Sequence, residues 1–153
     1  MYQRILVPFD GSPTSTRGLD EAIALAKLTG ARLRLLHLVD DLVYASGFET
    51  GAVYLSDVLP VMRQAGRTIL ANGRDRAQRA GLEVDTELVE GMGPRLAEVV
   101  AEQAATWGAD LIVIGTHGRR GVGRMLLGSD AEQVLRSAPV PVLLVRAPAG
   151  VTP

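Results

Sequence analysis

The chain has 153 residues, of which 47% are hydrophobic and 22% charged; this composition predicts one globular domain and excludes wholesale disorder. Its formal net charge of −1 gives no general attraction to nucleic acid or to anionic membranes, so we expect neither as a partner. The absence of cysteine excludes disulfides and thiolate metal sites, and no apolar run resembles a signal peptide or a membrane span, so we expect a cytoplasmic protein.

The first part of the chain predicts strand, helix and strand. The apolar run 5–9 leads into a turn, as a buried strand does. Thr14 or Ser15 is placed to cap the following helix, which Gly30 closes. The run 33–39 predicts the second strand. It contains a histidine that we expect to be a hydrogen-bonded core or loop-facing residue rather than a ligand.

The middle of the chain begins with an unusually long connection, from 40 to about 56. A second helix is predicted to start near Pro60, to carry Val61 toward the core and to end at Gly81, with an arginine-rich face left for solvent. The segment 82–89 then alternates apolar and acidic residues. This pattern is typical of a strand with one wet face, near the edge of a sheet.

The last part of the chain again alternates helix and strand. Pro94 suits a first helical position and predicts a third helix that stops at Gly108. The run 110–115 is the most clearly buried strand. A fourth helix is predicted over about 130–136, and a fifth strand over 140–145.

Strands that alternate with helices predict a parallel sheet joined by right-handed crossovers, with helices on both faces. Residues 1–147 are expected to form this single domain, and 148–153 a disordered tail. Pro141 places the fifth strand at a sheet edge, or makes it begin late. Because its apolar edge would invite aggregation if left bare, we predict a homodimer through strand 140–145.

Two loops are suited to bind a ligand beyond the carboxyl ends of the strands, where open α/β sheets leave a crevice. After the first strand, Asp10 offers a carboxylate to a ribose hydroxyl or a cation. After the fourth strand, the glycine-rich segment 115–129 leads into a helix, whose free N–H groups and dipole suit phosphate. Ser129 is placed to donate to such an anion while also capping the helix. The loop adds positive charge through Arg119, Arg120 and Arg124.

Three separated segments resemble one protein family. The spacing Gly115-x2-Gly118-x9-Gly128-Ser129 after an apolar strand is similar to the ATP-binding signature of universal stress proteins. The opening segment 5–12 and the ending segment 138–145 resemble the first and last strands of that family. The resemblance therefore covers nearly the whole chain.

The resemblance implies a three-layer α/β sandwich: a five-stranded parallel sheet in the order 3-2-1-4-5 with two helices on each face. It implies ATP between strands one and four, in a stress-response protein that acts as a nucleotide-dependent regulatory or binding module; whether magnesium or manganese accompanies ATP is left open. The predicted nucleotide-binding residues are Pro8, Phe9, Asp10, Val39, Ile114, Gly115, His117, Gly118, Arg119, Gly128, Ser129 and Asp130.

Within this set the resemblance implies separate roles. Pro8 and Asp10 match positions that flank adenine and ribose, Val39 an adenine contact, Ile114 and Gly115 the backbone beside the ribose, and Gly118, Gly128 and Ser129 the phosphate cradle. Asp130 departs from the family pattern, in which a small neutral or β-branched residue is common. A carboxylate there repels phosphate unless it caps the helix, points outward or shares a cation. His117 either orients the loop, which we favour, or contacts phosphate.

Nothing in the sequence demonstrates catalysis, and no catalytic residue is predicted. Lys27 is the sole lysine and does not follow a glycine, which excludes a P-loop lysine and argues against ordinary phosphoryl transfer. Two histidines without cysteine argue against a zinc site. Two alternatives stay open: an enzyme that slowly hydrolyses ATP or transfers adenylate, and an interaction protein that has lost nucleotide affinity through Asp130.

Overall fold

The computed structural model describes residues 1–40, 54–91, 93–116 and 127–146. The other residues carry several of the sequence predictions. Most of the long connection (41–53), the loop residues His117, Gly118 and Arg119, the two other loop arginines and the tail therefore lie outside the described residues.

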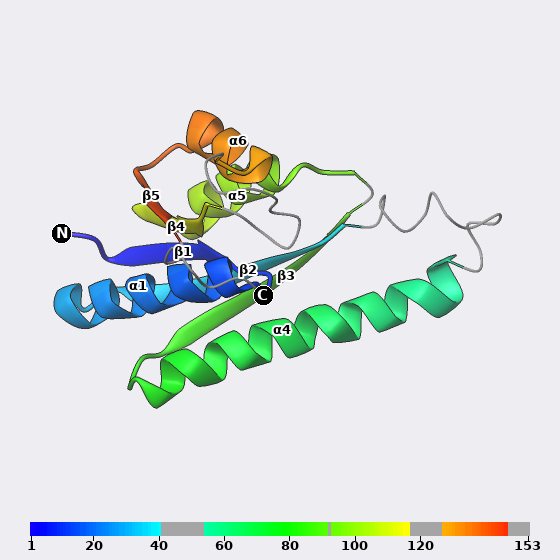
Figure 1. Cartoon of the computed structure of the whole chain (residues 1–153), viewed down its shortest axis with the longest axis horizontal. Coiled ribbons are helices and arrows are strands. Elements are labelled where there is room, and N and C mark those ends of the chain that lie inside the picture. Colours follow the sequence, from blue (N-terminus) through cyan, green and yellow to red (C-terminus); the bar gives the residue numbers. More distant parts are fainter. Residues whose placement is uncertain (41–53, 92, 117–126, 147–153) are drawn as a thin grey trace.

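A single parallel sheet forms the middle of the molecule (Figure 1). Its strands are β1 (Arg4–Pro8), β2 (Arg32–Asp40), β3 (Val84–Gly91), β4 (Leu111–Gly115) and β5 (Val142–Val145). They lie in the order β3-β2-β1-β4-β5, and every neighbouring pair is parallel. The predicted order is confirmed. β5 begins later than 140 because Pro141 has no N–H to donate; its carbonyl accepts the Ile112 N–H at 3.0 Å.

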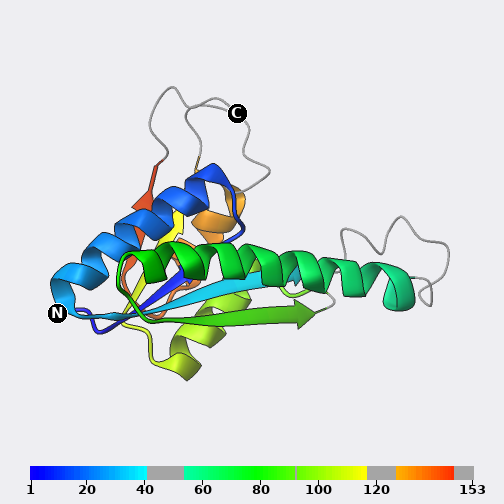
Figure 2. The same cartoon turned by 90° about the horizontal axis from the view of Figure 1, so that it is seen from below.

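Helices cover both faces of the sheet, so the predicted three layers are confirmed (Figures 1 and 2). One face carries α1 (Pro13–Thr29) and α4 (Leu59–Arg79), the latter preceded by the π-helical turn η1 (Tyr54–Val58). The other face carries α5 (Leu96–Trp107) and α6 (Ser129–Ser137). None of the helices in the described ranges is both long and apolar enough to cross a bilayer.

The three inner strands, β2, β1 and β4, supply residues to both layers of the core. On β1, Ile5 and Val7 pack under α1 and α4, whereas Leu6 packs under α5 and α6, and all three are fully buried. Burial on both faces is why β1 and β4 read as continuous apolar runs. β3 is an edge strand whose residues are only half-buried, which confirms the prediction from its alternating acidic residues.

Two predicted helix starts are wrong by a few residues. α1 is capped by Ser12 rather than by Thr14 or Ser15: the Ser12 Oγ accepts the Ser15 N–H at 3.1 Å. This earlier start is available because proline suits the first helical position, and Pro13 follows Ser12 directly. The predicted closure by Gly30 is confirmed; its left-handed backbone (φ 73°) directs its N–H to the Ala26 carbonyl.

The helix after Pro94 begins later than predicted. Arg95, in an extended conformation, precedes the first helical residue, Leu96. The Glu98 carboxylate reaches back to accept the Arg95 N–H at 3.3 Å, a bond that closes the first turn at this position. Pro94 therefore lies before the helix and not in it.

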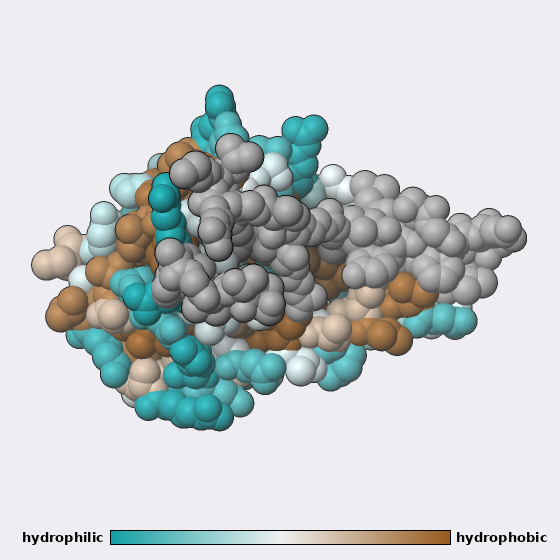
Figure 3. Space-filling model, viewed as in Figure 1, coloured by the Kyte–Doolittle hydropathy of each residue, from teal (hydrophilic) through white to brown (hydrophobic). Residues whose placement is uncertain are grey.

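The inward face of α4 also differs from the prediction. Its buried residues are Leu59, Gly66, Leu70, Gly73 and Ala77. Val61, predicted to face the core, is 67% exposed. Residues two apart on a helix do not share a face, so Val61 lies away from the face that Leu59 defines. It belongs to an exposed apolar patch over the amino-terminal turns of α4 (Figure 3).

Candidate functional site

The loops predicted to bind a ligand leave the same edge of the sheet. β1 and β4 are parallel neighbours, with Ile5 opposite Leu111 and Leu6 opposite Ile112. β2 lies on the other side of β1, whereas β5 lies on the other side of β4. The strand order thus changes direction between β1 and β4, and open α/β sheets hold ligands at such a point.

The first loop is fixed through its backbone. The Phe9 N–H donates to the Leu36 carbonyl at 2.8 Å, and the Phe9 carbonyl lies 2.8 Å from the Nδ1 atom of His37. Asp10 is half-buried, and its Oδ1 atom accepts the Ser12 N–H at 2.9 Å. The carboxylate therefore stands in a defined position beside the start of α1.

The second loop begins in direct contact with α1. A Cβ atom on Gly115 would lie 2.8 Å from the Thr14 carbonyl oxygen and 2.9 Å from the Thr14 carbonyl carbon. Gly115 has no positive φ, so glycine is needed here for close approach and not for its conformation. The next residue, Thr116, is buried, and its N–H continues the β4–β5 ladder by donating to the Val145 carbonyl at 2.9 Å.

The second loop returns to the place where it begins. The Gly128 N–H donates to the Thr116 carbonyl at 2.7 Å. Gly128 is also the N-cap residue of α6, and Ser129 is the first helical residue, so the predicted cap by the Ser129 side chain is wrong. Because Gly115 contacts Thr14 and Thr116 contacts Gly128, the end of β4, the first turn of α1 and the start of α6 meet at the carboxyl ends of the strands.

Asp130 occupies the first turn of α6 and is exposed. A carboxylate at this end of a helix is favoured by the free N–H groups and the helix dipole. Of the alternatives weighed from sequence, the outward one agrees with this exposure. Among residues 1–40, 54–91, 93–116 and 127–146, no three His, Asp or Glu side chains gather in a way that would hold a metal ion.

Several predicted site residues are held in the core by their side chains. Val39 is 3% exposed and packs with Leu59 under the start of α4. Ile114 packs in the α5–α6 layer of the core, and Pro8 is buried at the end of β1. What Val39 and Ile114 offer at the sheet edge is therefore their backbone.

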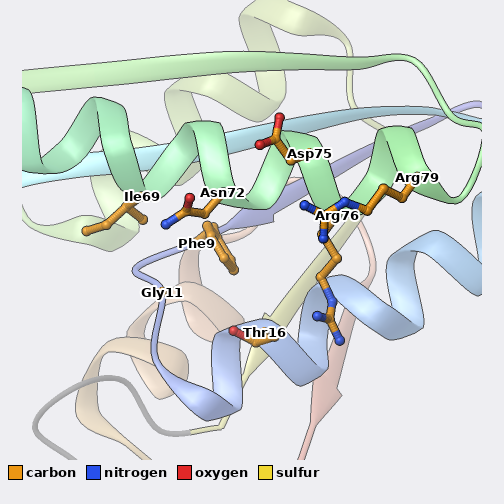
Figure 4. Close-up of a pocket in the computed structure, with 8 residues that line it drawn as sticks. All are labelled: Phe9, Gly11, Thr16, Ile69, Asn72, Asp75, Arg76 and Arg79. Atoms are coloured by element: carbon orange, nitrogen blue, oxygen red, sulfur yellow. The ribbon is translucent and has the colours of Figure 1, made fainter.

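The Phe9 ring faces α4. It is 5% exposed and packs so closely under that helix that a Cβ on Gly73 would lie 2.8 Å from its Cε1 atom. The ring forms one wall of a groove of about 490 Å³ between α1 and α4 (Figure 4). The residues lining it are Phe9, Gly11, Thr16, Ile69, Asn72, Asp75, Arg76 and Arg79.

One ion pair bridges this groove. Arg76 of α4 donates to both carboxylate oxygens of Asp20 on α1, at 2.6 and 2.9 Å. The hydrogen bond from Arg76 to Asp20, followed by the attraction of the Asp20 charge, raises the pKa of Arg76 above its ordinary value although partial burial opposes this. Sequence reasoning missed the groove because its walls come from helices far apart in the chain, and each wall alone reads as an ordinary solvated face.

Comparison with known proteins decides the family. The sequence profile described as the universal stress protein family matches residues 1–146. The chain belongs to the universal stress protein family. Universal stress protein MJ0531 of Methanocaldococcus jannaschii is 34% identical over 148 residues, which cover 97% of this chain and 84% of the relative.

Solved universal stress proteins have the same fold. A protein of the family from Burkholderia pseudomallei is 36% identical and has a TM-score of 0.76, with 95% of this chain and 97% of the other covered. A universal stress protein in complex with cAMP is 28% identical, with a TM-score of 0.67 and coverage of 95% and 97%. The fold and the family expected from the three sequence segments are thus confirmed.

Proposed function

We propose that this universal stress protein binds an adenine nucleotide, ATP in the first place, at the shared edge of β1 and β4. It would act there as a nucleotide-dependent regulatory or binding module of the cytoplasm, a setting compatible with its cysteine-free sequence. The observation that carries the proposal is the contact of Gly115, at the end of β4, with Thr14 in the first turn of α1, which follows the first loop directly, together with the hydrogen bond that brings Gly128 at the start of α6 to Thr116. A relative 28% identical, solved in complex with cAMP, supports the adenine class of ligand.

The residues at this edge suit the separate parts of such a ligand. Asp10, held by the Ser12 N–H, supplies a carboxylate for ribose hydroxyls. The backbone N–H groups of Ser129 and of the residues after it open the nine-residue helix α6 and suit phosphate oxygens. In this proposal a magnesium or manganese ion would be held mainly by the phosphates, because the described residues bring no set of three metal-binding side chains together.

Calorimetry with ATP and with cAMP tests the proposal. We expect the wild type to bind and Asp10→Ala to bind about tenfold or more weakly, since it loses a charged hydrogen-bonding group. Asp10→Asn keeps an oxygen that accepts the Ser12 N–H but removes the negative charge. Comparing it with Asp10→Ala therefore distinguishes the role of Asp10 in holding the loop from its contact with the ligand. Asp75→Ala, which removes an exposed carboxylate from the groove between α1 and α4, should bind like the wild type. A wild type without binding at millimolar nucleotide would reject the proposal.

We also propose that two copies pair through β5. β5 is the outermost strand beside β4, and Leu143, in its middle, is 38% exposed. An exposed edge with apolar side chains is a template for pairing with another strand. Light scattering should give a dimer for the wild type and a monomer for Leu143→Glu. A wild type that stays monomeric at every concentration would contradict this proposal.

A further inference from the structure

α4 carries two buried glycines, seven residues apart, that let it lie directly on the sheet. A Cβ on Gly66 would lie 3.0 Å from the His37 Cδ2 atom and 2.8 Å from a methyl of Leu88. A Cβ on Gly73 would lie 2.8 Å from the Phe9 Cε1 atom. Glycine is the poorest helix former after proline, so the helix accepts a local cost at both positions in return for this close contact.

Two of the residues beneath these glycines, His37 and Phe9, are joined by a hydrogen bond from the histidine ring to the phenylalanine backbone. The His37 Nδ1 atom lies 2.8 Å from the Phe9 carbonyl oxygen. Because a carbonyl can only accept, Nδ1 carries the proton and donates it. The Phe9 N–H donates to the Leu36 carbonyl, so Phe9 is held by its N–H, its carbonyl and its ring.

The residues that follow Phe9 depend on this arrangement. Asp10 is the next residue, and it receives the Ser12 N–H, while Ser12 in turn caps α1. Because both the N–H and the carbonyl of Phe9 are hydrogen-bonded, the direction in which the chain enters the turn is fixed. The carboxylate of Asp10 and the first turn of α1 are placed accordingly.

We propose that His37 is a positioning residue of the nucleotide site. By donating its Nδ1 proton to the Phe9 carbonyl under α4, it orients the first loop so that Asp10 meets the nucleotide. This inference rests on the proposed function, which it deepens. His37 itself is assigned no contact with the ligand.

Three variants separate positioning from general stability. His37→Leu removes the donor at similar size, whereas His37→Asn places an amide N–H near the position of Nδ1. Val100→Ala is the matched control, because it opens a cavity in the opposite layer of the core without touching Phe9 or His37. Calorimetry with ATP and cAMP should show His37→Leu weakened on the order of tenfold, as for one lost hydrogen bond. His37→Asn should stay within about threefold, and Val100→Ala should match the wild type.

Two further readouts need no nucleotide. Nitrogen NMR of the wild type should show the His37 ring protonated at Nδ1. Amide hydrogen exchange at Ser12 should be about tenfold faster in His37→Leu than in the wild type, with His37→Asn and Val100→Ala near the wild type. These readouts report the orientation of the first loop directly.

The outcomes distinguish the two ideas. If the wild type binds neither nucleotide, the proposed function is rejected, and so is the role of His37 in binding, even if NMR and exchange still find that His37 orders the loop. If the wild type binds but His37→Leu binds equally well, only the positioning role is overturned. It is overturned too if Val100→Ala loses as much affinity as His37→Leu, if His37→Asn is no better than His37→Leu, or if Nδ1 carries no proton.

Discussion

Replacing Gly115 by alanine should separate β4 from α1. The added Cβ would lie 2.8 Å from the Thr14 carbonyl oxygen, and ordinary van der Waals contact begins at 3.4 Å, so the two backbones must part by about 0.6 Å. Besides the Thr14 methyl, the atoms in the way belong to the Thr14 carbonyl group in the first turn of α1, which no side-chain rotation can move aside. Overpacking of this kind costs about 1–3 kcal/mol.

Urea unfolding measures this cost, and a second glycine across the same contact provides the control. Gly18 of α1 also lies against Gly115, but a Cβ there would meet the Gly115 nitrogen at an ordinary 3.4 Å. Gly18→Ala should therefore leave stability unchanged or raise it by up to about 1 kcal/mol through better helix propensity. Gly115→Ala should also weaken nucleotide binding, because Thr14 and the first loop shift with α1. A Gly115→Ala protein as stable as the wild type would refute the reasoning.

Three further substitutions follow from the described contacts. Ser12→Ala should lower the free energy of unfolding by about 1 kcal/mol, because the Ser15 N–H loses its cap, whereas Ser12→Asp should retain most of it; equal losses would contradict the capping role. Arg76→Gln should cost less than about 1 kcal/mol, since the pair with Asp20 is half-exposed, and the loss should shrink in 1 M salt; a salt-independent loss would argue against an ionic contribution. The pKa of Arg76 is raised in the folded state, so the stability that its charge contributes is complete below the pKa of the unfolded state and is lost only as pH rises through the pKa of the folded state. The difference in the free energy of unfolding between the wild type and Arg76→Gln should therefore stay constant in urea titrations between about pH 7 and pH 10. Val61→Ser should change stability by no more than about 0.5 kcal/mol, because the side chain is 67% exposed; a larger loss would mean that the valine is covered in solution.

The strand order and the layers were predictable because several independent signals agree. β4 and, after Arg4, β1 are apolar throughout, as strands buried on both faces must be, and β3 alternates, as an edge strand does. Helix starts were less predictable, because neighbouring residues compete for the same role. Ser12 and Ser15 can each cap a helix, and the choice depends on Pro13 between them.

The sequence indicates which segments form the candidate site but not how their side chains pack, and ligand binding by these residues stays a prediction. The sequence pattern places Phe9 beside Asp10 in the first loop, but it does not indicate that the Phe9 ring packs under α4. The sequence predicted a hydrogen-bonded His37, which the structure confirms, but it could not identify the partner, a backbone carbonyl 28 residues away in the chain. Only the packing of α4 on the sheet brings these groups together.

The hydrogen bond between Gly128 and Thr116 has a consequence for evolution and engineering. It pins together the two ends of the segment between them, so neither β4 nor α6 depends on the length of that segment for its own position. For a pinned segment, each doubling of length costs only about 0.6 kcal/mol in closure entropy. Insertions or deletions between Thr116 and Gly128 should therefore leave the packing of β4 and α6 on the core unchanged.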